Sequence, residues 1–327
     1  MLHITLRFRA LGLATVVALL ALAIASIGVE SGTARADELL RIQSDVTYDV
    51  RPDSGPVRVT WQVDLENNDP STRPRTFGTV FFYESVTLPV LQGASSVSAV
   101  GPSGAALGVS VERAEQGPVD VATIAFDREL YYGETYAFTL SYDLIDARSD
   151  ALLVSPAYVY VPAIVAGDEA SVRIETPDDP DWAVTVEPVD CALTAGGAFR
   201  CDGSERAQVA ALVEVTRPDA VESIEASAGL AEVDLALRVS YFPGQEAWAA
   251  HIQELATRAL PVLERLFGFP YDGPRVLSIA ERGRQDIAGY EGTFGCGAGT
   301  CSIGISPVAD DLIALHELAH LWTQPFE

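Results

Sequence analysis

The sequence has no lysine, and its 21 arginines are outnumbered by 46 aspartates and glutamates, which leaves a formal net charge of −25. Nucleic-acid binding needs a basic surface that displaces counterions from phosphates, so we expect no nucleic-acid partner. An acidic surface favours solubility and repels anionic membranes. Because 48% of the 327 residues are hydrophobic, we expect a globular protein with room for two cores.

Charged residues are sparse near the N-terminus. Arg7 and Arg9 precede an uncharged apolar stretch over 11–29, which is followed by Ala34-Arg35-Ala36. This order predicts a secretory signal peptide over 1–36, cleaved after Ala36. The alternative is an uncleaved anchor, because about 19 apolar residues can span a bilayer. In both cases the rest of the chain is exported, which predicts a secreted or cell-envelope protein and a membrane contact only through an uncleaved leader.

The sequence has only four cysteines, and none of them shows the C-x2-C spacing of common zinc-binding modules. They form two close pairs, Cys191 with Cys201 and Cys296 with Cys301. Three connectivities are possible for four cysteines, and pairing within each close pair is the simplest. In an oxidising compartment we therefore expect disulfides rather than a cysteine-based metal site.

No convincing helical pattern and no internal repeat occurs between about residues 40 and 230. Short stretches instead alternate apolar and polar residues, as in Val57–Leu65 and Tyr136–Tyr142, with Gly- and Pro-rich connections between them. Further candidate strands are Thr79–Tyr83, Ala122–Phe126, Ala157–Val161, Ser171–Glu175 and Ala183–Val186. The spacing predicts an all-β, sandwich-like domain over 37–231.

The pattern changes near residue 231. A strand over Val233–Tyr241 precedes a long helix from Gln245 to Phe267, whose apolar residues recur every three or four positions. Strands over 275–280 and 302–305 follow, and a second helix ends the sequence. Strands mixed with helices predict a second domain of α/β or α+β type over 232–327.

The last helix carries the motif with the clearest chemistry, His316-Glu317-Leu318-Ala319-His320. On a helix, His316 and His320 lie one turn apart on the same face, so both imidazoles can bind one metal ion. Glu317 is rotated by about 100° and is placed instead to take a proton from a water molecule that zinc activates. The alternative is a buried helix with two hydrogen-bonded histidines.

The start and end of this helix have their own signals. Ser306 is a good N-cap and Pro307 suits the first turn, so we expect the helix to begin there and to stop at Pro325. The glycine and the third histidine of the metzincin pattern are missing, because Thr323 and Phe326 occupy those positions. That class is excluded.

The extended motif His316-Glu317-Leu318-Ala319-His320-Leu321-Trp322 resembles the H-E-x-x-H-x-W core of the aminopeptidase N family of gluzincin metallopeptidases. The stretch from Val239 to Glu281, with its Pro-Gly turn, long helix and Phe-Gly-Phe-Pro-Tyr ending, is similar to the entry to that family's thermolysin-like catalytic domain. The resemblance is specific over about 233–327 and architectural over 37–232. It implies His316 and His320 as zinc ligands, Glu317 as general base, and zinc as the cofactor.

The resemblance also implies two further residues. Glu291, in Ala288-Gly289-Tyr290-Glu291-Gly292, matches the glutamate of the family's G-x-M-E-N motif, which binds the free amino group of the substrate, although the flanking residues differ. The family's third zinc ligand is a glutamate nineteen residues after the second histidine, which corresponds to about position 339. We therefore expect a truncated sequence that carries the first half of the catalytic domain, binds zinc weakly and is inactive alone.

The sequence thus predicts an exported zinc metallopeptidase, aminopeptidase-like, that hydrolyses peptide bonds of peptide or protein substrates by zinc-activated water. No cofactor beyond zinc is indicated, and exopeptidase and endopeptidase specificity both remain open. The alternative is a non-catalytic envelope protein whose β domain binds partners and whose zincin motif is a degenerate remnant.

Overall fold

The computed structural model describes residues 39–323 except 53–54, 74–80, 115–118, 146, 150–151, 188–190, 195–197, 204–206, 284–285 and 298. The predicted signal peptide over 1–36 and the predicted helix stop at Pro325 lie outside the described residues. Among the helices that the structure describes, none is long and apolar enough to span a membrane.

The described chain consists of strands as far as residue 241, apart from one turn of 3-10 helix, η2 (Pro70–Thr72). These strands are β1 (Leu40–Asp49), β2 (Val57–Asn67), β3 (Tyr83–Leu91), β4 (Ala94–Val100), β5 (Ala106–Glu112), β6 (Val119–Leu130), β7 (Thr135–Leu144), β8 (Arg148–Ser149), β9 (Leu152–Val154), β10 (Tyr158–Ala166), β11 (Glu169–Glu175), β12 (Ala183–Glu187), β13 (Cys191–Leu193), β14 (Phe199–Gly203), β15 (Ala207–Thr216), β16 (Glu222–Gly229) and β17 (Asp234–Tyr241). The prediction of an all-β N-terminal region is confirmed at the level of strands and sheets.

The largest sheet has ten strands in the order β13-β14-β11-β1-β2-β7-β4-β5-β6-β3. Strand β1 pairs with β2 in antiparallel and with β11 in parallel register. The alternation read from the sequence of β2 is present in its burial, because Val59, Trp61 and Val63 are buried while the residues between them face outward. A second sheet has the order β12-β15-β10-β9-β8.

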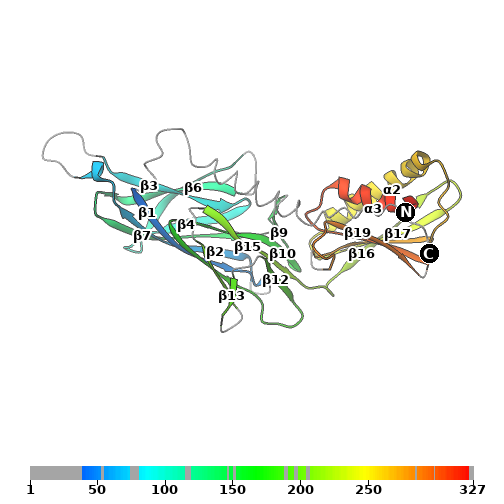
Figure 1. Cartoon of the computed structure of the whole chain (residues 1–327), viewed down its shortest axis with the longest axis horizontal. Helices are drawn as coiled ribbons and strands as arrows, with labels where there is room; N and C mark the ends of the chain where they lie inside the picture. The colour runs from blue at the N-terminus through cyan, green and yellow to red at the C-terminus, as the bar shows by residue number, and fades with distance from the viewer. Residues whose placement is uncertain are drawn as a thin grey trace, which may run out of the picture. The chain divides into compact units, whose positions relative to one another are not determined.

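The C-terminal region combines helices with a sheet whose strands lie in the order β16-β17-β18-β20-β19. Its remaining elements are α2 (Glu246–Phe267), β18 (Val276–Glu281), β19 (Gly292–Gly297), β20 (Thr300–Ile305) and α3 (Asp311–Thr323). Helices α2 and α3, yellow and red in Figure 1, pack together on one face of this sheet. Their buried residues share one core with β17, β18 and β20.

The described residues divide into two compact units. The first comprises those up to Leu152 with Val161–Pro177 and Val186–Val213, and the second comprises Leu153–Tyr160, Asp178–Thr185 and those from Glu214 onward. The boundary predicted at 231/232 stays a prediction. Strand β16, which precedes that boundary, pairs along its whole length with β17.

Two predicted boundaries differ from the structure. Helix α3 begins at Asp311 rather than near Pro307, and Asp310 caps it by accepting a hydrogen bond from the amide of Ile313 at 3.1 Å. Ser306 directly follows β20 and is fully buried, and its hydroxyl has no hydrogen-bond partner among the described residues, so its side chain does not cap the helix. Strand β3 begins at Tyr83, where the predicted strand over 79–83 was expected to end.

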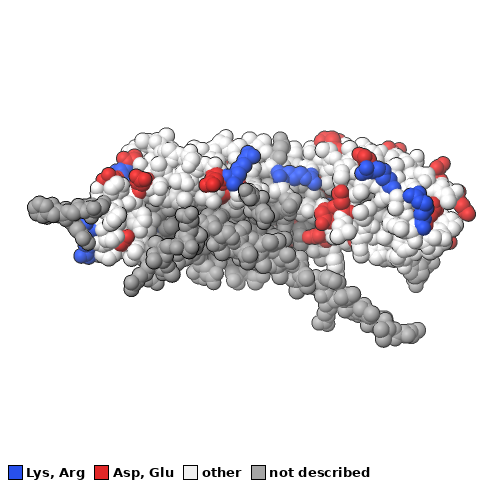
Figure 2. Space-filling model, turned by 90° about the horizontal axis from the view of Figure 1, so that it is seen from above, with Lys and Arg blue, Asp and Glu red and all other residues white. Residues whose placement is uncertain are grey.

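Charged side chains are scattered over the described surface. Figure 2 shows arginines and acidic residues interspersed on the face in view. Several form exposed ion pairs, such as Arg41 with Glu66 and Arg128 with Glu134. Pairs of this kind contribute little to stability individually.

Candidate metal centre

Helix α3 presents the H-E-x-x-H residues on two of its faces. The buried face consists of Ala314, Glu317, Leu318, Leu321 and Trp322, which recur at helical spacing and pack into the core. His316 is exposed and His320 is half-buried, beside that face. The helix therefore anchors Glu317 inside the unit and leaves the imidazole pair at its border.

The two imidazoles point at each other. The Nε2 atoms of His316 and His320 lie 3.3 Å apart, with the rings perpendicular and their centroids 4.8 Å apart. Two nitrogens that bind one tetrahedral zinc at about 2.0–2.1 Å are themselves about 3.3–3.4 Å apart. The described residues therefore fit the metal that the sequence predicts.

His320 has contacts on its other side as well. Its Nδ1 lies 3.1 Å from the hydroxyl oxygen of Thr323, and its ring lies 5.6 Å from the ring of Phe294 on β19. Burial, and then the neighbouring His316, lower the pKa of His320. Both contacts orient the ring, and a lower pKa favours the neutral imidazole that a metal requires.

Glu317 is 6% exposed and lies directly against the backbone of β19. A Cβ atom added to Gly292 would lie 2.8 Å from Cγ and Oε1 of Glu317 and 2.7 Å from Cγ2 of Ile313. Only glycine allows this approach. Burial raises the pKa of Glu317 and the nearby His316 lowers it, which suits a carboxylate that accepts and returns a proton.

Within the part of the chain that the structure describes, His316, Glu317 and His320 form the one group of three potential metal ligands, with ligand atoms within 4.8 Å of one another. Catalytic zinc takes three protein ligands and a water molecule. The two imidazoles satisfy the geometry of two of these ligands. A carboxylate oxygen of Glu317 lies within 4.8 Å of a ring nitrogen of each histidine.

Glu291 is not part of this group. It is half-buried and immediately precedes β19, and its backbone carbonyl accepts a hydrogen bond from the amide of Ser306 at 2.8 Å. This bond fixes the backbone at the start of the strand that contacts Glu317. Its role as an amine-binding residue stays a prediction.

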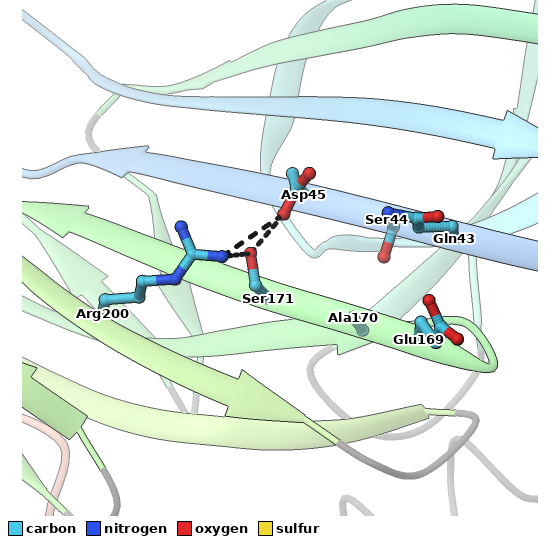
Figure 3. A pocket seen from close by; sticks show the side chains of 7 residues that line it. All are labelled: Gln43, Ser44, Asp45, Glu169, Ala170, Ser171 and Arg200. Carbon is cyan, nitrogen blue, oxygen red and sulfur yellow. Dashed lines mark hydrogen bonds and ion pairs between the residues drawn. The ribbon is translucent and has the colours of Figure 1, made fainter.

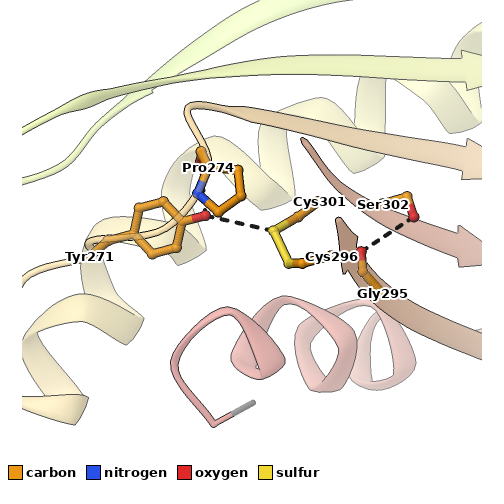
Figure 4. Close-up of a disulfide and its surroundings, with 6 residues drawn as sticks. All are labelled: Tyr271, Pro274, Gly295, Cys296, Cys301 and Ser302. Atoms are coloured by element: carbon orange, nitrogen blue, oxygen red, sulfur yellow. Dashed lines mark hydrogen bonds between the residues drawn. A yellow bond between two sulfur atoms is a disulfide. The ribbon is translucent and has the colours of Figure 1, made fainter. Parts of the chain in front are cut away.

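Both expected disulfides are present, which confirms pairing within each close pair of cysteines. Cys191 faces Cys201 across β13 and β14, and Cys296 faces Cys301 across β19 and β20. Figure 4 shows the second disulfide beside Tyr271, whose hydroxyl oxygen lies 3.8 Å from Sγ of Cys301. Burial raises the pKa of Tyr271 to about 12, so its hydroxyl stays protonated and donates to the carbonyl of Pro274 at 2.9 Å.

A second polar cluster lines a shallow pocket of about 150 Å³ in the first unit (Figure 3). Ser171 donates a hydrogen bond to Asp45, and Arg200 donates to the hydroxyl of Ser171 at 3.2 Å and lies 4.0 Å from Asp45. The acid and the base of this cluster compensate each other. It offers no convergent metal ligands.

Sequence reasoning missed three residues at the centre, namely Gly292, Phe294 and Thr323. Gly292 and Phe294 reach it from a strand whose sequence, GTFGCG, has no strong strand pattern. Thr323 is near His320 in sequence, and a polar residue three positions after a predicted ligand is a signal that could have been used.

Comparisons with known proteins give low similarity. No protein-family model and no curated protein matches the chain. Among solved structures, the M1 zinc metallopeptidase of Deinococcus radiodurans matches with 17% identity and a TM-score of 0.31, over 86% of this chain and 64% of its own. A mutant of that protein bound to a Tyr-Ser-Ala substrate matches with 18% identity, a TM-score of 0.31 and the same coverage.

The aminopeptidase N family protein of Idiomarina loihiensis matches with 13% identity and a TM-score of 0.32, over 86% of this chain and 47% of its own. The chain thus spans less than two thirds of the length of these structures. TM-scores of this size do not establish a common fold.

Proposed function

We propose that the protein is an exported zinc metallopeptidase, aminopeptidase-like, that cleaves peptide bonds of peptide or protein substrates. The observation that carries the proposal is the pair of Nε2 atoms 3.3 Å apart on one turn of α3, with the carboxylate of Glu317 buried beside them. The distance between the two Nε2 atoms, which also permits a hydrogen bond between the rings, equals that between two nitrogen ligands of one zinc ion and so supports a metal ion at this place.

His316 and His320 would hold the zinc through Nε2. When bound, zinc acts as a Lewis acid that lowers the pKa of a water molecule and polarises the scissile carbonyl. Glu317 accepts the proton as the water attacks the carbonyl carbon, and returns it to the amine nitrogen as the C–N bond breaks. The backbone of Gly292 and the buried position of Glu317 keep bulk water from competing for the carboxylate.

Glu291 would bind the free amino group of the substrate, as the resemblance implies. The same resemblance implies a glutamate at about position 339 as the third ligand. The activity test is therefore made on the protein as its gene encodes it.

The test compares the unchanged protein with Glu317→Gln, which keeps the size and burial of the side chain but cannot accept a proton. We expect hydrolysis of an aminoacyl-p-nitroanilide to fall by about 10²–10⁴-fold, the usual contribution of a general base, while the bound zinc stays constant. Glu254→Gln, an exposed glutamate on α2 paired with Arg258, serves as the matched control. An unchanged rate in Glu317→Gln contradicts the assignment and favours the non-catalytic binding protein.

A further inference from the structure

Strand β19 has few features of its own that fix its position in the sheet. It lies at the edge of its sheet, where β20 is its one partner among the described strands. Three of its six residues, Gly292, Gly295 and Gly297, are glycines, and glycine loses the most backbone entropy in a strand and contributes no side-chain packing. The pairing of β19 therefore needs support beyond its own sequence.

The same strand touches two of the three residues of the metal group. The ring of Phe294 lies against His320, and the backbone of Gly292 lies against Glu317. A shift of β19 by one residue would put Glu291 or Thr293 in the place of Gly292, where an added Cβ meets Glu317 at 2.8 Å. A slip by one residue would also move Phe294 to the other face. The geometry of the group thus depends on the register of β19.

The Cys296–Cys301 disulfide fixes that register. The two cysteines are directly opposite in the ladder, two residue pairs from Phe294–Ile303, and their Cα atoms are 4.1 Å apart. A disulfide forms only between residues that face each other closely. The covalent bond therefore excludes the shifted pairings that the glycine-rich strand would otherwise tolerate.

The disulfide is also connected to helix α3 by side-chain contacts that run through Tyr271. Sγ of Cys301 lies 3.8 Å from the hydroxyl oxygen of Tyr271, whose ring packs edge-on against Trp322 with centroids 5.6 Å apart. Trp322 follows His320 by two residues on the same helix. Figure 4 shows Tyr271 and the disulfide side by side above α3.

We propose that the Cys296–Cys301 disulfide positions the metal-binding residues of α3, so that its loss weakens zinc binding while the chain stays folded. This inference rests on the proposed zinc site and adds to it a covalent support outside the ligands. Partners of this kind, which orient ligands without binding the metal, typically change metal affinity by about 10–100-fold when they are lost.

The chain contains a matched control. Cys191 and Cys201 also face each other across an antiparallel pair, with Cα atoms 4.2 Å apart. In each disulfide the second cysteine is buried, Cys201 at 3% and Cys301 at 0% exposure. The Cys191–Cys201 disulfide belongs to the first unit, whereas the metal group belongs to the second.

The experiment measures Zn²⁺ binding by equilibrium dialysis for the whole chain and for two double variants, Cys296→Ala with Cys301→Ala and Cys191→Ala with Cys201→Ala. Folding of each is verified by far-UV circular dichroism at the same temperature. We expect binding about tenfold weaker or more in the first variant, and within about twofold of the unchanged chain in the second. Equal losses in both, or no change in the first, overturn the proposal.

A further variant decides the outcome if removal of the Cys296–Cys301 disulfide unfolds the chain. Phe294→Ala keeps both disulfides and removes the ring that orients His320, so weaker zinc binding supports the proposal and unchanged binding overturns it. His316→Ala with His320→Ala separates the two levels of inference. If this double histidine variant binds zinc as tightly as the unchanged chain, the proposed metal site is wrong. If it loses zinc binding while Cys296→Ala with Cys301→Ala keeps it, only the proposed role of the disulfide is wrong.

Discussion

Two polar clusters of this chain differ in how their groups are satisfied. In the first unit, the guanidinium of Arg200 and the carboxylate of Asp45 both form hydrogen bonds with the hydroxyl of Ser171. In the second, the Nε2 atoms of His316 and His320 lie 3.3 Å apart, and Glu317 is buried beside them. In the first cluster the charged groups are paired with each other, whereas the proposed metal ion would bind between the groups of the second.

The supports of the two clusters differ as well. The side chains of Asp45 and Arg200 are 55% and 54% exposed on the surface of β strands, where water screens their attraction. The metal group lies on a helix whose buried face is packed into a core and whose glutamate touches a glycine backbone. A polar cluster is a candidate site when the surrounding core, rather than its own side chains, holds its geometry. The following predictions test this difference between the two clusters.

The largest effect is expected from removal of the imidazoles. His316→Ala with His320→Ala removes both fitted ligands, so we expect zinc affinity to fall by more than about 100-fold, the upper range for loss of metal-orienting groups. Isothermal titration with Zn²⁺ measures this. Arg200→Ala in the other cluster should leave zinc affinity unchanged, and a comparable loss there would remove the distinction between the clusters.

The next effect is expected from Gly292→Ala. The added methyl group meets Glu317 and Ile313 at under 3 Å, so we expect the free energy of unfolding to fall by about 1–3 kcal/mol, as for other overpacked positions. Urea denaturation measures it. Gly295→Ala, in the same strand, is the matched control because its added Cβ meets nothing within 4 Å. Equal losses in the two variants would show that strand propensity, rather than contact with Glu317, sets the effect.

The smallest effect is expected from Arg200→Ala on stability. Its interactions with Ser171 and Asp45 are at the surface, so we expect the free energy of unfolding to change by less than about 1 kcal/mol. Thermal unfolding at low and high salt measures this, and the difference should shrink as salt increases. A loss of several kcal/mol that salt does not affect would show that the first cluster is held as rigidly as the second.

Local patterns in the sequence predict much of this fold. The alternation in β2, β7 and β17, the spacing of apolar residues in α2 and the end of that helix at Phe267 depend on neighbours in the chain, and all are present in the structure. The two disulfides were predictable for the same reason, because each closes a short hairpin.

Long-range contacts account for the misplaced start of α3 and for the missed support of the metal group. Ser306 has the chemistry of an N-cap, but it is buried at the end of β20, and Asp310 caps the helix instead. Likewise, nothing in GTFGCG indicates that its first glycine must lie against a glutamate 25 positions further along the chain. The H-E-x-x-H motif predicts which residues bind a metal, and the structure shows which residues contact them.

The central claim is that His316 and His320 bind one zinc ion through their Nε2 atoms. Anomalous diffraction at the zinc edge, from crystals of the chain grown with Zn²⁺, tests it most directly. The account predicts one strong peak between the two rings, about 2.0–2.1 Å from each Nε2 atom. Zinc peaks only at other positions, with the two imidazoles free of metal, would contradict it.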